Sequence, residues 1–156
     1  MLHILFVCTG NICRSPTAEG VLRHRLRARG LDKKILVDSA GTHGYHIGEA
    51  PDSRSISVAA MHGIDLKGLR GRKVSAQDFE TFDFILGLDY EHMEHLHRMK
   101  PPNAKAHTAL FLEYAGATKE KEVPDPYYGD ASHFKAVFDL IEAGAEPLID
   151  KLERQL

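Results

Sequence analysis

Residues 5–20 read LFVCTGNICRSPTAEG, and this stretch connects an apolar segment to an amphipathic one. The apolar segment, LHILFV at 2–7, is nearly continuous in hydrophobicity, which is typical of a parallel strand covered on both faces. Apolar residues then recur at helical spacing over 16–29, and the pattern stops at Gly30. The stretch therefore predicts a strand and a helix joined by a short loop over 8–14.

The rest of the chain repeats this alternation of strand and helix. Further strands are expected in the apolar runs at 34–39, 82–88 and 104–111. Helical patterns occupy 52–62, 89–99 and 132–154. The last helix is expected to bend or break near Gly144 or Pro147. This order predicts an α/β fold in a single domain over 1–156, an open parallel four-stranded sheet flanked by helices.

Composition and charge exclude several classes of protein. With 156 residues, 43% hydrophobic and 27% charged, the chain is long enough to fold without a disulfide or a metal. No apolar run approaches the roughly 18 residues that a membrane-spanning helix needs. A nucleic-acid-binding surface normally comes with a basic pI, and the pI here is about 6.5, so nucleic-acid binding is not expected. The first residues lack the features of a signal peptide, so the two cysteines predict a reducing, cytoplasmic setting.

The loop over 8–14 has the composition of an anion site. Ligands of open parallel sheets bind at the carboxyl ends of strands, and this loop directly follows the first strand. Ser15 is a suitable N-cap and Pro16 suits the first helical position, so a helix N-terminus with free N–H groups faces the loop. Gly10 can adopt a positive φ and Asn11 tolerates one, which would turn successive N–H groups toward phosphate oxygens. The guanidinium of Arg14 can grip two such oxygens.

Cys8 lies at the base of this loop. A positive field that binds an anion also favours the thiolate over the thiol. Such a sulfur can attack phosphorus and form a covalent phosphoenzyme, and the Ser15 hydroxyl would ease its departure afterwards. The plain alternative for Cys8 is a small buried apolar residue at a strand end, and for Cys13 a plain packing role is an equally good interpretation.

The loop sequence CTGNICRSP resembles the C-x-G-N-x-C-R-S-P loop of the low-molecular-weight protein tyrosine phosphatases. The resemblance continues in the same order through DSAGT at 38–42, APDSRS at 50–55, HGI at 62–64, Asp89 and DPYYGD at 125–130. It implies phosphotyrosine hydrolysis through a phosphocysteine intermediate, with Cys8 as the nucleophile and Arg14 as the phosphate-binding group. The site that binds the substrate phosphate would be lined by Thr9, Gly10, Asn11, Ile12, Cys13 and Ser15.

Asp125 lies in the longest segment without periodicity, 114–130, between Pro124 and Pro126, which favour an extended backbone. From the residues alone it is either a structural turn aspartate or a catalytic one. The resemblance implies that it is the general acid and then the general base. It also implies that aromatic residues wall the cleft, namely Tyr45, Tyr127 and Tyr128. Four further residues resemble positions that brace the loop or its surroundings: Asp38, Ser39, His62 and Asp89. For Asp38 and His62 an ordinary cap or turn residue is an equally good interpretation.

The resemblance leaves related activities to compare. A thiol-dependent arsenate reductase needs further cysteines, and none follows Cys13. A phosphoarginine phosphatase typically has threonine at the position of Ile12 and lacks the paired tyrosines. An inactive phosphotyrosine-binding module would be expected to lack Cys8 or Asp125. The expected partners are therefore a tyrosine-phosphorylated protein, with a tyrosine kinase among the candidates, and phosphate or another oxyanion.

No cofactor or metal is expected. The histidines of EHMEHLH, His92, His95 and His97, do not form an H-E-x-x-H motif, and a solvated helix surface is the favoured interpretation. Related phosphatases with both cysteines trap oxidation as a disulfide, which makes a protective Cys8–Cys13 bond an expectation for this chain.

Overall fold

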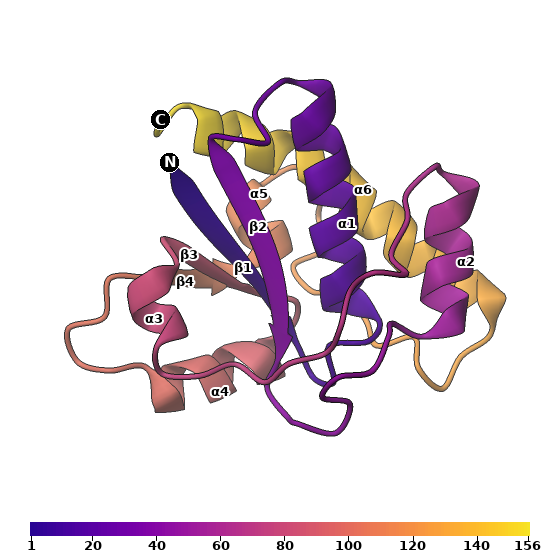
Figure 1. Cartoon of the computed structure of the whole chain (residues 1–156), viewed down its shortest axis with the longest axis horizontal. Helices are drawn as coiled ribbons and strands as arrows, with labels where there is room; N and C mark the ends of the chain where they lie inside the picture. Colours follow the sequence, from indigo (N-terminus) through magenta and orange to yellow (C-terminus); the bar gives the residue numbers. More distant parts are fainter.

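A parallel sheet of four strands in the order β2-β1-β3-β4 forms the centre of the molecule (Figure 1). The computed structural model describes residues 1–156. Its strands are β1 (Leu2–Cys8), β2 (Ile35–Gly41), β3 (Phe84–Gly87) and β4 (His107–Leu110). The sheet confirms the predicted fold class; β3 and β4 lie inside their predicted runs, β1 extends one residue beyond its run and β2 extends two.

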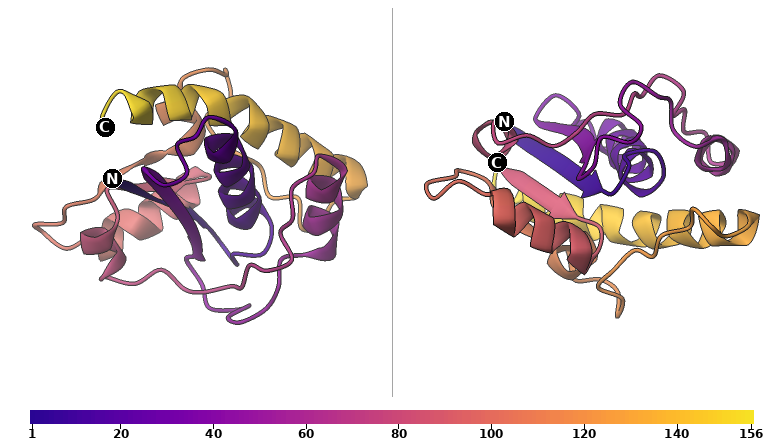
Figure 2. Two further views of the ribbon diagram at one scale, coloured as in Figure 1. Left: turned by 45° about the horizontal axis from the view of Figure 1, so that its top comes forward. Right: turned by 90° about the horizontal axis from the view of Figure 1, so that it is seen from below.

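Helices cover both faces of the sheet (Figure 2). They are α1 (Arg14–Ala28), α2 (Ser53–Met61), α3 (Asp78–Thr81), α4 (Tyr90–Met99), α5 (Phe111–Ala115) and α6 (Ala131–Glu153). Alternate residues of β1 point to opposite faces: Ile4 and Phe6 join the core with α1 and α6, whereas Leu5 and Val7 join the core with α3 and α4. Because both faces are buried, β1 has no polar side, and its sequence is apolar apart from His3 near its start.

The predicted break in the last helix does not occur, because α6 runs through both Gly144 and Pro147. The proline loses one intrahelical hydrogen bond, but Leu148, Ile149 and Leu152 of the same stretch are fully buried against the core. Gly144 instead serves packing, since a Cβ there would lie 2.8 Å from the Phe111 ring. The two short helices α3 and α5 lie outside the sequence prediction, and α5 begins at Phe111, the last residue of the predicted fourth strand.

Backbone hydrogen bonds connect the carboxyl ends of β1 and β2 and the loops that follow them. Cys8 pairs with Gly41 across the two strands. Beyond them, the N–H of Thr42 donates to the Cys8 carbonyl at 2.8 Å, and the N–H of His43 donates to the Thr9 carbonyl at 3.0 Å. The loop after β2 therefore holds the first residues of the loop after β1. None of the helices is both long and apolar enough to cross a membrane.

At Gly41 the connected strand ends leave no room for a side chain. A Cβ there would lie 2.7 Å from the Thr9 carbonyl oxygen and 3.2 Å from the Asn11 nitrogen, both of which are backbone atoms. We expect Gly41→Ala to lower the free energy of unfolding by about 1–3 kcal/mol, as overpacked substitutions do. Urea titration of the wild type and the variant measures this difference.

Gly68→Ala is the matched control, because a Cβ at Gly68 meets no atom within 4 Å. Its effect should stay within about 0.5 kcal/mol. Equal effects of the two substitutions would show that the backbone around Gly41 can move to accommodate a Cβ atom.

Candidate active site

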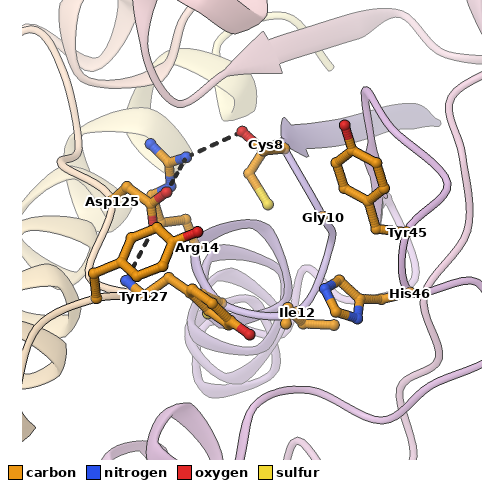
Figure 3. Close-up of a pocket in the computed structure, with 11 residues that line it drawn as sticks. Cys8, Gly10, Ile12, Arg14, Tyr45, His46, Asp125 and Tyr127 are labelled. Atoms are coloured by element: carbon orange, nitrogen blue, oxygen red, sulfur yellow. Dashed lines mark hydrogen bonds and ion pairs between the residues drawn. The ribbon is translucent and has the colours of Figure 1, made fainter.

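A cavity of about 270 Å³ opens at the carboxyl end of β1. It is lined by Cys8, Thr9, Gly10, Ile12, Cys13, Arg14, Tyr45, His46, Asp125, Tyr127 and Tyr128. Figure 3 shows the Cys8 sulfur between two walls, with Arg14, Asp125 and Tyr127 on one side and Tyr45 and His46 on the other. The structure thus brings together predicted site residues from three distant parts of the chain.

The loop over 8–14 reaches its shape through Asn11, which has a φ of 58°. This left-handed conformation is the one expected for asparagine in a tight loop. Gly10 does not have a positive φ, so the reason predicted for that glycine was wrong. Its small size is needed instead because a Cβ at Gly10 would lie 2.9 Å from the His46 ring.

The Asn11 side chain ties the loop to two other elements. Its Oδ1 accepts from the N–H of Arg72 at 3.0 Å, which orients the amide so that Nδ2 faces the opposite way. Nδ2 then donates to Ser15 Oγ at 2.8 Å and to Ser39 Oγ at 2.9 Å. Ser39 passes its own hydrogen to the buried carboxylate of Glu19 at 2.6 Å. Every donor in this buried chain has a defined acceptor.

This network decides what Ser15 does for Cys8. Ser15 Oγ accepts from Asn11, and its own hydrogen remains free to point at the Cys8 sulfur, 2.9 Å away. The alternative acceptor, the Ala40 carbonyl, is farther away at 3.4 Å. The arrangement suits a sulfur that carries negative charge, because a hydroxyl aimed at a thiolate is a charge-assisted hydrogen bond.

Ser15 is therefore not the N-cap of the first helix, as its sequence position predicted. The helix α1 begins at Arg14, and Cys13 occupies the N-cap position without any side-chain capping bond. The Ser15 hydroxyl is already engaged with Asn11 and Cys8, so it is not available to cap backbone N–H groups. The prediction failed because local capping preference competes here with a tertiary hydrogen-bond network.

The guanidinium of Arg14 is buried and fixed in place by hydrogen bonds. It is 2% exposed, and its Nη1 donates to Asp89 Oδ2 at 2.7 Å and to the Val123 carbonyl at 2.9 Å. Burial would raise the pKa of Asp89, but His92 and Arg14 together hold it below its ordinary value. A charge that is buried and paired in this way keeps a defined orientation, which an anion-binding group needs.

His92 is a site residue that the sequence interpretation missed. It is 1% exposed rather than solvated. Its Nδ1 accepts from the N–H of Asp89 at 3.1 Å in a capping box, and its Nε2 lies 3.0 Å from Thr9 Oγ1 and 3.3 Å from Arg14 Nη2. Burial lowers the pKa of His92 to about 4, and the Arg14 charge acts in the same direction. All three histidines of EHMEHLH were expected to be exposed. Of the other two, His97 is exposed and His95 is partly buried.

Asp125 and the tyrosines form the mouth of the cavity. The Asp125 side chain is 50% exposed, lies 3.9 Å from Arg14 Nη2 and accepts the N–H of Tyr127 at 3.0 Å. Tyr127 and Tyr128 meet edge to face, with ring centroids 5.0 Å apart. On the opposite side, Tyr45 stacks on His43 with ring centroids 5.1 Å apart. The opening is thus rimmed by aromatic rings on two sides.

Cys13 lines the same cavity, but it is chemically different from Cys8. Burial raises the pKa of the Cys13 thiol to about 12, with the charge of Asp52 acting in the same direction. Cys13 packs in a small apolar cluster with Ile12 and Phe134. Both cysteines are free, and the protective disulfide between them stays a prediction.

The residues expected to brace the loop divide into two groups. Ser39 bonds Asn11, Asp89 bonds Arg14, and Asp38 pairs at 3.1 Å with Arg72, whose N–H holds Asn11. His62 does not reach the loop: it is the C-cap residue that follows α2, and its ring stacks on Phe138, with ring centroids 4.2 Å apart. No group of three or more His, Cys, Asp or Glu side chains is arranged to hold a metal ion.

Other residues join the site without having been predicted for it. They are His92, His46, Glu19 and Arg72. Only His92 carried a local signal, because an aspartate followed three residues later by a polar side chain resembles a capping box. Glu19 lies one position too late for a capping box, and the other two lie in loops without a pattern.

Comparison with known proteins gives consistent matches over the whole chain. A family model described as low molecular weight phosphotyrosine protein phosphatase matches residues 3–156. The low molecular weight protein-tyrosine-phosphatase YfkJ of Bacillus subtilis is 38% identical over 155 residues, which span 99% of this chain and 98% of that protein. A crystal structure of a protein tyrosine phosphatase from Entamoeba histolytica, with Hepes in its active site, has a TM-score of 0.94 at 38% identity and 99% coverage of both chains. The crystal structure of a Drosophila arginine phosphatase has a TM-score of 0.86 at 32% identity and 96% coverage of both chains.

The depressed pKa of His92 predicts a specific loss of stability in acid. Between the ordinary histidine pKa of 6.5 and the folded value of about 4, the unfolded chain binds a proton that the folded chain does not. Stability from this source is therefore complete above pH 6.5 and falls as the pH drops toward 4, by on the order of 3 kcal/mol. Urea titrations of wild type and His92→Gln across this range should show a flatter pH dependence for the variant.

His97→Gln is the control on the same helix, because His97 is exposed. It should retain the pH dependence of the wild type. Parallel curves for wild type and His92→Gln would mean that His92 is protonated in the folded protein.

Proposed function

Because the chain belongs to the low molecular weight phosphotyrosine protein phosphatase family, we propose that it hydrolyses phosphotyrosine in proteins through a phosphocysteine intermediate. One observation carries the proposal: Cys8 lies at the base of an aromatic-rimmed cavity, with the Ser15 hydroxyl 2.9 Å from its sulfur. Arg14, on the wall of the same cavity, supplies the positive charge for the phosphate.

In the first step the Cys8 thiolate attacks phosphorus. A phosphorus–sulfur bond forms while the phosphorus–oxygen bond to the tyrosine ring breaks. Asp125, which is protonated for this step, donates its proton to the leaving phenolate oxygen. Arg14 and the loop N–H groups hold the other phosphate oxygens, whose charge is spread in the transition state.

In the second step Asp125, now a carboxylate, takes a proton from water as that water attacks phosphorus. The phosphorus–sulfur bond breaks, inorganic phosphate forms and Cys8 leaves as a thiolate. The Ser15 hydroxyl stabilises the departing sulfur, because its hydrogen has no nearer acceptor than Sγ. The proposed cycle consumes one water and returns Asp125 to its protonated form.

Hydrolysis of phosphoarginine is the second candidate activity, since a Drosophila arginine phosphatase has the same fold. The walls of the cavity favour a phosphorylated ring instead. Ile12 adds an apolar surface to the cavity, and Tyr127 and Tyr45 face it from opposite sides. Aromatic walls can stack on the planar ring of phosphotyrosine, whereas the N–H groups of a phosphorylated guanidinium need polar partners that such walls do not supply.

The proposed partners follow from this chemistry. The substrate is a tyrosine-phosphorylated protein, with a tyrosine kinase among the candidates, and the product phosphate occupies the loop after turnover. The mechanism depends on a thiol that an oxidising compartment would consume, so we place the enzyme in the cytoplasm.

Matched peptides that carry phosphotyrosine, phosphoserine or phosphoarginine test the substrate class. We expect phosphotyrosine to be hydrolysed with the highest kcat/KM, in the presence or absence of EDTA. Cys8→Ser should show no measurable turnover while retaining vanadate or phosphate binding, because the loop remains and only the nucleophile is lost. Faster turnover of phosphoarginine would replace the proposed activity with the second candidate.

Asp125→Asn tests the proton donor. The variant should lose about 10²–10⁴-fold in kcat/KM for phenyl phosphate, whose leaving group needs a proton. It should lose far less for p-nitrophenyl phosphate, whose leaving group is stable as an anion. Equal losses for both substrates would assign the proton transfer to another residue.

A further inference from the structure

Asp125 has few contacts of its own that fix its position. Its side chain is half exposed, and its distance of 3.9 Å to Arg14 is long for an ion pair. Its closest hydrogen bond, from the N–H of Tyr127, is local to the same loop. The position of this carboxylate in the cavity that holds Cys8 therefore depends on what holds the backbone of residues 124–129, which we call the acid loop.

The acid loop has a single hydrogen bond between its backbone and a side chain outside it. Arg54 of α2 donates through Nη1 to the Gly129 carbonyl at 3.2 Å. The same guanidinium lies over the Tyr127 ring at 5.7 Å and over the Phe134 ring at 4.3 Å. The remaining backbone bond within the loop, from Gly129 to Pro126, is internal. Arg54 thus contacts both the backbone of the acid loop, at Gly129, and an aromatic side chain of that loop, Tyr127.

Arg54 is itself fixed to the phosphate-binding loop. Its Nε and Nη2 donate to the two oxygens of Asp52 at 3.0 and 2.9 Å, a forked pairing that sets the plane of the guanidinium. The N–H of Asp52 donates in turn to the Ile12 carbonyl at 2.8 Å. A continuous path of hydrogen bonds therefore runs from Ile12, beside Cys8, through Asp52 and Arg54 to Gly129.

We propose that Arg54 is a positioning residue that holds Asp125 over Cys8 by clamping the acid loop to the phosphate-binding loop. The inference rests on the proposed role of Asp125 as the general acid. Arg54 acts through geometry rather than through charge, because Asp52 already neutralises its guanidinium. Small misplacements of a catalytic group have large effects on rate, so a loosened clamp should appear as impaired proton donation.

Kinetics of Arg54→Met with two aryl phosphates test the proposal. We expect kcat/KM for phenyl phosphate to fall about 10-fold more than kcat/KM for p-nitrophenyl phosphate, a part of the full effect of losing the acid. Arg54→Lys keeps the charge beside Asp52 but lacks the planar fork, so it should fold and show the same selective loss. Far-UV circular dichroism and thermal melting verify the fold of each variant.

Two further variants make the result decisive. Arg54→Met combined with Asp125→Asn should be no more selective between the two substrates than Asp125→Asn alone, because positioning a missing acid has no effect. Arg70→Met is the matched control, since Arg70 is exposed and donates only to the carbonyls of Lys67 and Leu69. It should leave both rates unchanged.

The outcomes separate this inference from the proposed function. If Asp125→Asn is selective for the poor leaving group and neither Arg54 variant is, the acid is assigned correctly and the clamp is overturned. A raised KM for both substrates with no selectivity would make Arg54 a substrate-binding cation instead. If Asp125→Asn itself shows no selectivity, the assignment of the acid fails and the inference falls with it.

Discussion

The orientation of one buried amide governs the geometry of this site. The side-chain oxygen of Asn11 accepts a hydrogen bond from the N–H of Arg72, so the side-chain nitrogen faces Ser15 and Ser39 and donates to both. That direction leaves the Ser15 hydrogen for the Cys8 sulfur. The same residue carries the positive φ that curls the loop. Backbone shape and hydrogen-bond direction therefore depend on a single side chain, whose satisfied network is costly to disturb in a buried setting.

Buried charge at the base of the cavity is balanced by close partners. Arg14 would be expensive to bury alone, and Asp89 with the Val123 carbonyl offsets that cost. His92 completes the arrangement in its neutral form, because burial and the Arg14 charge both lower its pKa. The result is one guanidinium facing the anion, with its orientation set by Asp89 at the start of α4 and by the segment before the acid loop.

The mouth of the cavity is built differently from its base. Its tyrosines are exposed to different degrees, from 39% at Tyr127 to 94% at Tyr128, and the segment that bears them has few bonds to the rest of the molecule. A fixed base and a lightly held rim suit a reaction in which the phosphate must be placed accurately while the attached protein varies. The path from Ile12 through Asp52 and Arg54 connects the two parts.

The strands and most helices follow from local patterns, because periodic hydrophobicity reflects which faces are buried, and the loop at 8–14 follows from glycine, asparagine and arginine in a short span. Tertiary structure decided the rest. Ser15 looked like a cap and His92 like a solvated residue, but the Ser15 hydroxyl is engaged with Asn11 and Cys8 inside the folded loop, and the His92 ring bonds Thr9, which is distant in sequence. His62 resembled a bracing residue and instead stacks on Phe138. Arg54 and Arg72 gave no local signal, since a hydrogen bond between distant segments leaves no periodicity in the sequence and exists only once the chain has folded.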